Sequence, residues 1–396
     1  MLSTPTRLLT VLALCSPLAA LAGVKVTVTR ADTAARPAQT VLVPYAEVKK
    51  QIPDLLLEHV AVRDAAGALV PSQVTNYNPE QRPAAYDEIL FQVAFAAGQQ
   101  SATFTIDNDP NPVPPAPSKV FARYIPERLD DFAFENDRLA HRIYGPGLAS
   151  PATGKSELVS SGIDVWLKRV NYLIVDRWYT KGHDAYHVDS GEGMDLYGVN
   201  NSRGCGGTGI WNNNHLYVSS NWSSWKVIAN GPVRAIFELN YSTWDAGGVY
   251  VAETKRFTID AGSNFHRVES TFRYNSKGNT PLTVAVGIGK HAAVVSAELT
   301  KSPDNSYLSL WELYRKDGQL GTSVILDPQS PRKGVAEDTL NHLLLTEAHS
   351  GKPLAYYIGA GWDRSGQFAD RAAWETYVRD FAARLAAPLT VTVSKE

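Results

Sequence analysis

The sequence predicts an all-β protein in which a small N-terminal β-sandwich precedes a larger antiparallel sandwich. Segments rich in aromatic and β-branched residues recur along the chain, and turn clusters such as DAGSN and NSKGNT separate them. The run DPNPVPPAPS (109–118) holds five prolines in ten residues, which is typical of a stiff linker between domains. The strands do not alternate with helices, so antiparallel sheets are expected.

The first 22 residues predict a secretory signal that is cleaved after Ala22. An apolar run from Leu8 to Leu21 ends in small residues, and it is too short and interrupted to span a membrane. Leu14 disfavours a lipoprotein signal at Cys15. We therefore expect a periplasmic or extracellular protein. After cleavage Cys205 is the only cysteine, so a large core must stabilise the fold without a disulfide.

The charge balance disfavours two classes of partner. The chain carries 38 basic and 40 acidic residues, and loss of Arg7 with the signal leaves a formal charge of about −3. Nucleic acids and anionic membranes require a basic face, so neither is expected as a partner. The chain also lacks the G-x-S-x-G nucleophile motif, and no motif indicates a nucleotide cofactor.

Residues 23–108 predict the small sandwich, of immunoglobulin-like type. VKVTVTR (24–30) alternates apolar and polar residues, as a half-buried strand does. Residues 60–74 predict a hairpin that turns near Gly67, and residues 89–106 predict a second hairpin that turns at Gly98.

Residues 119–396 predict the large sandwich. Its expected strands are 162–170, 234–244, 253–260, 265–275, 282–289 and 354–362. One helix is expected over 370–386, because six apolar residues from Trp374 to Leu385 share one helical face. Asp370 is its expected N-cap and Pro388 follows it, and residues 389–393 predict a closing strand.

The stretch KGHDAYHVDSGEGMDLYGV (181–199) concentrates titratable groups in one glycine-rich bend. His187, His183 and Tyr186 are candidates for acid–base catalysis, because histidine titrates near neutral pH. The same bend could hold zinc or calcium through His183, His187 and Asp189. A solvated polar loop is the third interpretation.

A second polar cluster lies in ERLDDFAFENDRLAHRIYGP (127–146). Strand alternation places Arg142 and Tyr144 on one face, where Arg142 would meet an anionic substrate. The structural alternative is an ion-pair network among Glu135, Asp137, Arg138 and Arg142.

Tryptophans and asparagines gather in RGCGGTGIWNNNHLYVSSNWSSW (203–225) and favour a sugar-binding surface. Cys205 is expected to pack in the core. His291 could enter the same cleft, although a lone histidine is more often structural. The candidate substrate-binding residues are Glu135, Asn136, Arg138, Trp178, Arg203, Trp211 and Trp222.

Several runs resemble a secreted bacterial family known as domain of unknown function 4861. They are DDFAFENDRLAHRIYGPGL, RWYTKGHDAYHVDSGEGMDLYGV, GCGGTGIW and GWDRSGQF, together with the W-x-x-Y-V helix. The resemblance covers nearly the whole mature chain. It implies a galactose-mutarotase-like supersandwich and a gene neighbourhood devoted to polysaccharide breakdown, often of uronic-acid-rich glycans. One member of the family is an oligosaccharide dehydratase that produces an unsaturated uronate.

We therefore expect a lyase or dehydratase that performs β-elimination on a uronic-acid-containing oligosaccharide. Arg142 or a bound cation would neutralise the carboxylate, His187 or His183 would remove the C5 proton, and Tyr186 would protonate the leaving O4. A mutarotase or epimerase, and a glycan-binding protein without catalysis, are alternatives. A glycoside hydrolase would need two carboxylates, for which the candidates are Glu135, Asp137, Glu192 and Asp195.

Overall fold

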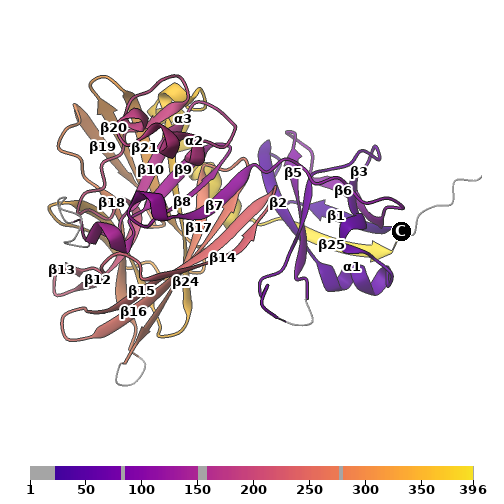
Figure 1. Ribbon diagram of the computed structural model, residues 1–396, viewed down its shortest axis with the longest axis horizontal. Helices are drawn as coiled ribbons and strands as arrows, with labels where there is room; N and C mark the ends of the chain where they lie inside the picture. The colour runs from indigo at the N-terminus through magenta and orange to yellow at the C-terminus, as the bar shows by residue number, and fades with distance from the viewer. Residues whose placement is uncertain (1–22, 82–84, 150–157, 276–279, 396) are drawn as a thin grey trace, which may run out of the picture.

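The computed structural model describes residues 23–81, 85–149, 158–275 and 280–395. It shows a small and a large β-sandwich side by side (Figure 1). The prediction of an all-β fold is confirmed. Within the described ranges, no helix is long and apolar enough to cross a membrane. The predicted signal, residues 1–22, lies outside the described residues.

The small sandwich consists of a four-stranded and a three-stranded sheet with the strand orders β25-β1-β6-β3 and β2-β5-β4. Its core is mainly aliphatic and includes Val24, Val26 and Val28, which point inward from alternate positions of β1. The strands are β1 (Val24–Thr29), β2 (Arg36–Pro44), β3 (Val60–Asp64), β4 (Ser72–Thr75), β5 (Glu88–Phe95), β6 (Ser101–Asn108) and β25 (Thr390–Lys395), and helix α1 spans Tyr45–Gln51.

Both predicted hairpins are wrong in one respect. The turns lie where expected, with Gly67 and Gly98 each at φ +81. However, β3 pairs with β6 whereas β4 pairs with β5. The turn at Gly67 closes only a short hairpin, in which Val70 N donates to Val62 O at 2.8 Å, before the chain crosses to the other sheet. The turn at Gly98 carries the chain directly from one sheet to the other. A corner between packed sheets and a hairpin have the same apolar alternation, so the pattern cannot separate them.

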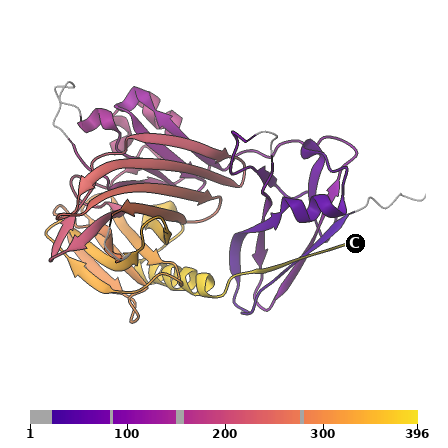
Figure 2. The same cartoon turned by 90° about the horizontal axis from the view of Figure 1, so that it is seen from below.

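The C-terminal strand corrects the predicted boundary of the large domain, 119–396. Strand β25 pairs with β1 along its whole length, with Val393 opposite Val26. Val391 and Val393 pack on the core of the small sandwich. Figure 2 shows this last strand running from the large sandwich across to the small one. It covers the edge of β1 that would otherwise present unpaired backbone groups.

The large sandwich packs an eight-stranded sheet against two five-stranded sheets around one hydrophobic core. The eight-stranded sheet has the order β14 (Ser224–Asn230), β15 (Arg234–Asp245), β16 (Tyr250–Asp260), β17 (Phe265–Tyr274), β24 (Pro353–Trp362), β21 (Gly318–Leu326), β20 (Tyr307–Tyr314) and β19 (Ser296–Lys301). One five-stranded sheet has the order β11 (Gly193–Asp195), β10 (Ile163–Lys168), β9 (Leu139–Ile143), β8 (Asp131–Asn136) and β7 (Val120–Ile125). The other has the order β13 (His215–Tyr217), β12 (Cys205–Asn212), β18 (Leu282–Gly289), β23 (Asn341–Ala348) and β22 (Gly334–Glu337).

Aromatic rings join the layers of the large sandwich. Phe134 of β8 meets Phe237 and Phe257 of the eight-stranded sheet at centroid distances of 5.0 and 5.4 Å. Cys205 is buried and unpaired, and burial raises the pKa of its thiol to about 12. It packs in the core, as predicted, and is not a reactive thiolate.

Helix α3 (Arg371–Ala386) confirms the predicted C-terminal helix. The Asp370 side chain accepts a hydrogen bond of 2.9 Å from Ala373 N and caps its start. Trp374 is fully buried and donates to Ser309 Oγ at 3.0 Å. A short helix, α2 (Val175–Lys181), was not predicted, and it leads directly into the bend at 181–199.

Candidate functional site

The outer face of the sheet β11-β10-β9-β8-β7 carries a row of charged residues. Strand alternation turns His141 toward the core and Arg142 outward, as the sequence predicts. The register places Arg142 opposite Asp164 of β10. Asp131 of β8 and Asp195 of β11 complete the row. We call these four residues the acidic cluster.

Arg142 lies at the centre of the acidic cluster. Its Nη2 lies 2.7 Å from Asp164 Oδ2 and 3.2 Å from Asp195 Oδ2, and its Nε lies 4.0 Å from Asp131 Oδ2. All four side chains are buried. Arg142 is thus already occupied by carboxylates and is not free to bind an anionic substrate, contrary to the prediction. The predicted ion-pair network with Glu135, Asp137 and Arg138 is also wrong, because alternation and register select other partners.

Three buried carboxylates around one guanidinium cannot all be ionised at low cost. Burial raises the pKa of Asp131 to about 7, with Arg142 opposing the shift. Burial also raises the pKa of Asp164, and burial together with the Asp164 charge raises that of Asp195 well above its usual range. The acidic cluster therefore retains at least one proton at neutral pH.

Helix α2 and the 3-10 turn Ala185–His187 cover this face of the sheet. Trp166 of β10 stacks on Trp178 and on Tyr186 at centroid distances of 5.5 and 4.8 Å. The Tyr186 hydroxyl accepts long hydrogen bonds from Arg142 Nη1 (3.4 Å) and Arg128 Nε (3.3 Å). Tyr186 is 2% exposed and does not line the neighbouring cavity, so its position does not fit the predicted role of an acid. Its hydroxyl instead holds the guanidinium groups of Arg142 and Arg128 in place.

A cavity of about 310 Å³ opens beside the acidic cluster, and we call it the histidine cavity. It takes side chains from the 3-10 turn before β8, from β9, from the bend and from the segment after β11. Its polar lining residues are Arg128, Arg142, Tyr144, His183, His187, Asp195 and Asn200. The structure thus brings together three of the four predicted catalytic residues, namely Arg142, His183 and His187.

His187 and Asp195 form an acid–base pair in the histidine cavity. His187 Nδ1 lies 3.7 Å from Asp195 Oδ2, and the His187 side chain is 40% exposed. Partial burial, together with the charges of His183 and Arg142, lowers the pKa of His187. Its imidazole is therefore neutral at pH 7 while the carboxyl beside it favours the protonated form. Opposite shifts of this kind separate the base from the acid in enzyme sites.

Arg128 is a site residue that sequence reasoning missed. It lines the histidine cavity and, within the described part of the chain, makes no ion pair with a carboxylate. Leu129 and Asp130, which follow it, adopt left-handed φ values of 51 and 62. Gly145 permits this turn, since a Cβ there would lie 1.5 Å from Asp130 O. Gly145, 17 residues from Arg128 in the sequence, is therefore the feature by which this turn could have been predicted.

The predicted substrate-binding residues of β8 have structural roles. Glu135 is buried, lies 2.8 Å from Lys168 Nζ, and accepts hydrogen bonds from the backbone nitrogens of Ile174 and Val175 at the start of α2. Asn136 donates to the carbonyls of Asp260 and Ser263, both at 2.7 Å. Arg138 does not line the histidine cavity.

The predicted tryptophan surface is not assembled. Trp178 and Trp222 are buried, and the Trp222 indole donates to Ile143 O at 3.4 Å. Trp211 packs against a small cluster around Leu343. Arg203 is 1% exposed and donates to Ser161 Oγ at 2.8 Å. The composition of this segment resembles that of a sugar site, but the tryptophans themselves pack in the interior or against apolar side chains.

The structure does not bring the predicted metal ligands together. Asp189 pairs with Arg169 at 3.0 Å and accepts from the backbone nitrogens of Gly191 and Gly193. Across the ranges that the structure describes, no three His, Cys, Asp or Glu side chains are arranged to hold a metal ion. His183 and His187 do stack on each other, with a centroid distance of 4.6 Å.

Of the four carboxylates proposed for a glycoside hydrolase, only Asp195 lines the histidine cavity. Glu192 pairs with Lys181 and Arg177, each at 2.7 Å, and hydrogen bonding by Lys181 and Tyr172 lowers its pKa to about 2. Asp137 accepts from Gly262 N at 2.6 Å. His291 contacts Glu312 through Nδ1 (2.8 Å) and Gly198 O through Nε2 (3.1 Å), so it supports one wall of the cavity.

Replacing Asp131 with asparagine should change how stability depends on pH. A carboxyl whose pKa rises from 3.8 to about 7 on folding stabilises the protein below pH 3.8, and this contribution is lost as pH rises through 7. The free energy of unfolding of Asp131→Asn relative to wild type should therefore rise with pH across this window, by about 4 kcal/mol at most.

Urea titrations at several pH values would measure this difference. Buried His141, whose pKa is lowered to about 4, acts in the opposite direction in the same window, but it is present in both proteins and cancels. A difference that is constant between pH 4 and 8 would show that Asp131 has no raised pKa.

The fold and the site define an all-β protein of two sandwiches with a cavity lined by histidine, arginine and aspartate on the outer face of one sheet of the large sandwich. The model of the domain of unknown function DUF4861 matches residues 28–391, and the chain belongs to this family. The resemblance that the sequence indicated is thereby confirmed. One relative, Uncharacterized protein P7 of Formosa agariphila, is 31% identical over 353 residues, which are 85% of each chain.

Two solved structures match this chain over 94% of its length, at 10% identity. They are an α-mannosidase from Enterococcus faecalis V583 (TM-score 0.46) and a glycosyl hydrolase family 38 protein from Enterococcus faecalis (TM-score 0.48). The chain spans about half of their length, 46% and 47% respectively.

Proposed function

We propose that this protein is a carbohydrate-active enzyme that performs β-elimination on uronic-acid-containing oligosaccharides, as a dehydratase or lyase. One observation carries the proposal. The histidine cavity holds a neutral imidazole, His187, beside a carboxyl that favours its protonated form, Asp195, and an arginine, Arg128, that has no ion-pair partner among the residues the structure describes. Elimination next to a carboxylate requires these three functions: a base, an acid and a fixed cation.

The proposed reaction starts with binding of the uronate carboxylate by Arg128. The guanidinium stabilises the negative charge that develops on this carboxylate when the C5 proton leaves. His187 removes the C5 proton, and the electron pair of the C5–H bond forms the C4–C5 double bond. The C4–O4 bond breaks, and Asp195 gives its proton to the leaving oxygen.

The geometry provides a route for regeneration of the two groups. After the reaction His187 is protonated and Asp195 is ionised. Because Nδ1 and Oδ2 are only 3.7 Å apart, the proton can return from the histidine to the carboxylate once the product has left. The acidic cluster supports this return, since Asp131 and Asp164 disfavour a third ionised carboxylate around Arg142.

The proposal includes export of the protein, on the evidence of the signal predicted at residues 1–22. The partner is then an anionic oligosaccharide outside the cytoplasm. The cavity, at about 310 Å³, lies at the lower end of the ~300–1,000 Å³ range of small-molecule sites. It therefore suits one end of a short oligosaccharide.

An ultraviolet assay tests the proposal. The mature protein would be incubated with oligosaccharides of ulvan, pectin, alginate and glucuronoxylan, with and without a chelator. We expect the conjugated C4–C5 double bond to produce absorbance with one of these substrates. Mass spectrometry then separates loss of water from loss of a sugar. A change in anomeric or epimeric ratio without absorbance would support an epimerase instead, and no change in any substrate would overturn enzymatic action on these glycans.

Arg128→Gln should lower kcat/KM by about 10- to 100-fold, because it removes a charge-assisted hydrogen bond to the substrate carboxylate. The loss should appear in both KM and kcat, because Arg128 binds the carboxylate and also stabilises the charge that develops in the transition state, and Arg128→Lys should recover part of it. Arg256→Gln is the matched control, since Arg256 is a surface arginine of β16 that pairs with Glu238 of β15. Unchanged kinetics of Arg128→Gln would remove this residue from the site.

A further inference from the structure

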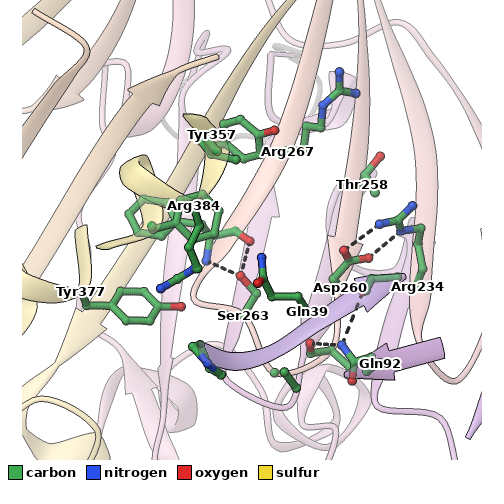
Figure 3. A pocket seen from close by; sticks show the side chains of 18 residues that line it. Gln39, Gln92, Arg234, Thr258, Asp260, Ser263, Arg267, Tyr357, Tyr377 and Arg384 are labelled. Atoms are coloured by element: carbon green, nitrogen blue, oxygen red, sulfur yellow. Dashed lines mark hydrogen bonds and ion pairs between the residues drawn. The ribbon is translucent and has the colours of Figure 1, made fainter. Parts of the chain in front are cut away.

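A second cavity, of about 210 Å³, lies where the two sandwiches and helix α3 meet (Figure 3). Strand β2 and Gln92 of β5 form the wall on the side of the small sandwich. The ends of β15 to β17 and the last turns of α3 form the opposite wall. We call it the junction cavity. None of its lining residues belongs to the histidine cavity.

The walls of the junction cavity are held together by hydrogen bonds between the domains. Gln92 Nε2 donates to Ala261 O at 2.8 Å, and Arg36 Nη2 donates to Ala387 O at 3.1 Å. The Gln73 amide bonds to the backbone at the start of β15, including Arg234 O at 3.0 Å. The cavity is therefore formed before any ligand arrives, which reduces the entropic cost of binding.

Three arginines line the junction cavity, and two of them are neutralised. Arg234 makes a bidentate pair with Asp260 at 2.6 and 2.7 Å. Arg267 pairs with Glu269. Arg384 differs from both, because within the described ranges it has no ion pair and no hydrogen bond from its guanidinium. Its partial burial lowers its pKa, and the nearby Tyr377 and Asp380 oppose this shift without forming an ion pair with it.

Aromatic rings frame Arg384. Its Cζ lies 5.5 Å from the centroid of Phe381 and 5.9 Å from that of Tyr377. Tyr357 meets Phe381 edge to face at 5.5 Å. Such rings present flat apolar surfaces to the C–H groups of a ligand ring.

Polar groups complete the lining. Figure 3 shows Arg384 and Tyr377 on one side of the cavity, the Arg234–Asp260 pair on the other, and Gln39 between them. Gln39 accepts from Arg36 through Oε1, which leaves its amide nitrogen as a donor. The Tyr377 hydroxyl accepts from Asn264 N at 3.1 Å, so its own proton can be donated.

From this arrangement we infer that the junction cavity binds a small ring-bearing carboxylate, of the size of one sugar acid. Arg384 binds the carboxylate, Tyr357 and Phe381 pack on the ring, and Gln39 and Tyr377 bond to its hydroxyls. A volume below the ~300 Å³ lower bound of drug-sized sites limits the ligand to about one ring. The site has no acid–base pair and serves binding, so it extends beyond the proposed reaction.

Isothermal titration calorimetry with the full-length mature protein tests this inference. The probes are galacturonate, glucose as the neutral sugar, and benzoate as a ring carboxylate without hydroxyls. We expect galacturonate to bind, glucose to bind at least tenfold more weakly, and Arg384→Gln to weaken galacturonate binding by about 10- to 100-fold. Arg379→Gln is the matched control. Arg379 lies on the exposed face of α3, and its guanidinium donates a hydrogen bond to Thr376 of the same helix.

Arg128→Gln separates this site from the proposed reaction, because Arg128 is the residue proposed to bind a uronate carboxylate in the histidine cavity. In that variant, adding Arg384→Gln should weaken galacturonate binding by the same factor as in the wild-type protein. This factor should not depend on how far the variant has lost turnover. Benzoate binding as tight as galacturonate would overturn the sugar-acid assignment. Equal binding of glucose, or unchanged binding in a folded Arg384→Gln protein with wild-type thermal stability, would overturn the site itself, and Arg384 would then serve only the end of α3.

Discussion

His187→Ala is expected to reduce turnover of an acidic oligosaccharide by about 10²- to 10⁴-fold, the usual contribution of a positioned general base. Its imidazole is half-exposed in the histidine cavity and makes no hydrogen bond on which the fold depends. The variant should therefore unfold at the wild-type temperature. Initial rates from ultraviolet absorbance and thermal unfolding measure both quantities.

Two controls sharpen the test of His187. His215→Ala replaces an exposed histidine of β13 that contacts only Tyr217 among the aromatic rings, and it should leave the rate unchanged. The pH profile supplies a second readout. The acid limb of kcat/KM should lie below 6.5, the ordinary pKa of histidine, because the environment of His187 lowers its pKa. A full rate in His187→Ala would contradict the proposed mechanism.

Lys168→Met is expected to have the largest effect on stability, a loss of about 3–5 kcal/mol. Lys168 and Glu135 are both buried and lie 2.8 Å apart, so removal of the lysine leaves an unpaired charge in the interior. Glu135 also accepts from the first backbone nitrogens of α2, and α2 leads into the bend that carries His187. The variant should therefore lose activity together with stability. Urea unfolding monitored by tryptophan fluorescence gives the free energy.

A double variant and a surface control test the cause of this loss. Lys168→Met with Glu135→Gln should recover part of the stability, because no buried charge remains unpaired and the glutamine can still cap α2. Lys181→Met breaks an exposed pair with Glu192 and should cost no more than ~1 kcal/mol. Equal losses in Lys168→Met and Lys181→Met would show that burial does not determine the effect.

Local patterns were sufficient for much of the fold. The six apolar residues of α3 and its cap at Asp370 predict the helix to within one residue. The alternation in LAHRIYG correctly predicts that Arg142 lies on the face opposite to that of His141. These properties depend on residues a few positions apart in the same segment, so they do not depend on the tertiary structure.

The partners of Arg142 could not be predicted in the same way. Asp164 and Asp195 are 22 and 53 residues away, and only the register of β9, β10 and β11 brings them to one guanidinium. The sequence neighbours Glu135 and Arg138 were more obvious candidates, but Glu135 is committed to Lys168 and α2. Residues that are close in sequence on a strand diverge to opposite faces, while distant ones meet across the ladder.

The sequence by itself therefore determined the class of fold, the family, the C-terminal helix and two histidines of the cavity. Only the tertiary structure decided that Arg142 is occupied, that Arg128 has no carboxylate partner in the described part of the chain, that Tyr186 is buried, and that the last strand returns to the small sandwich. Element type follows from periodicity within a segment. Charge, proton affinity and access at a site depend on burial and on partners that sheet pairing selects across the whole chain.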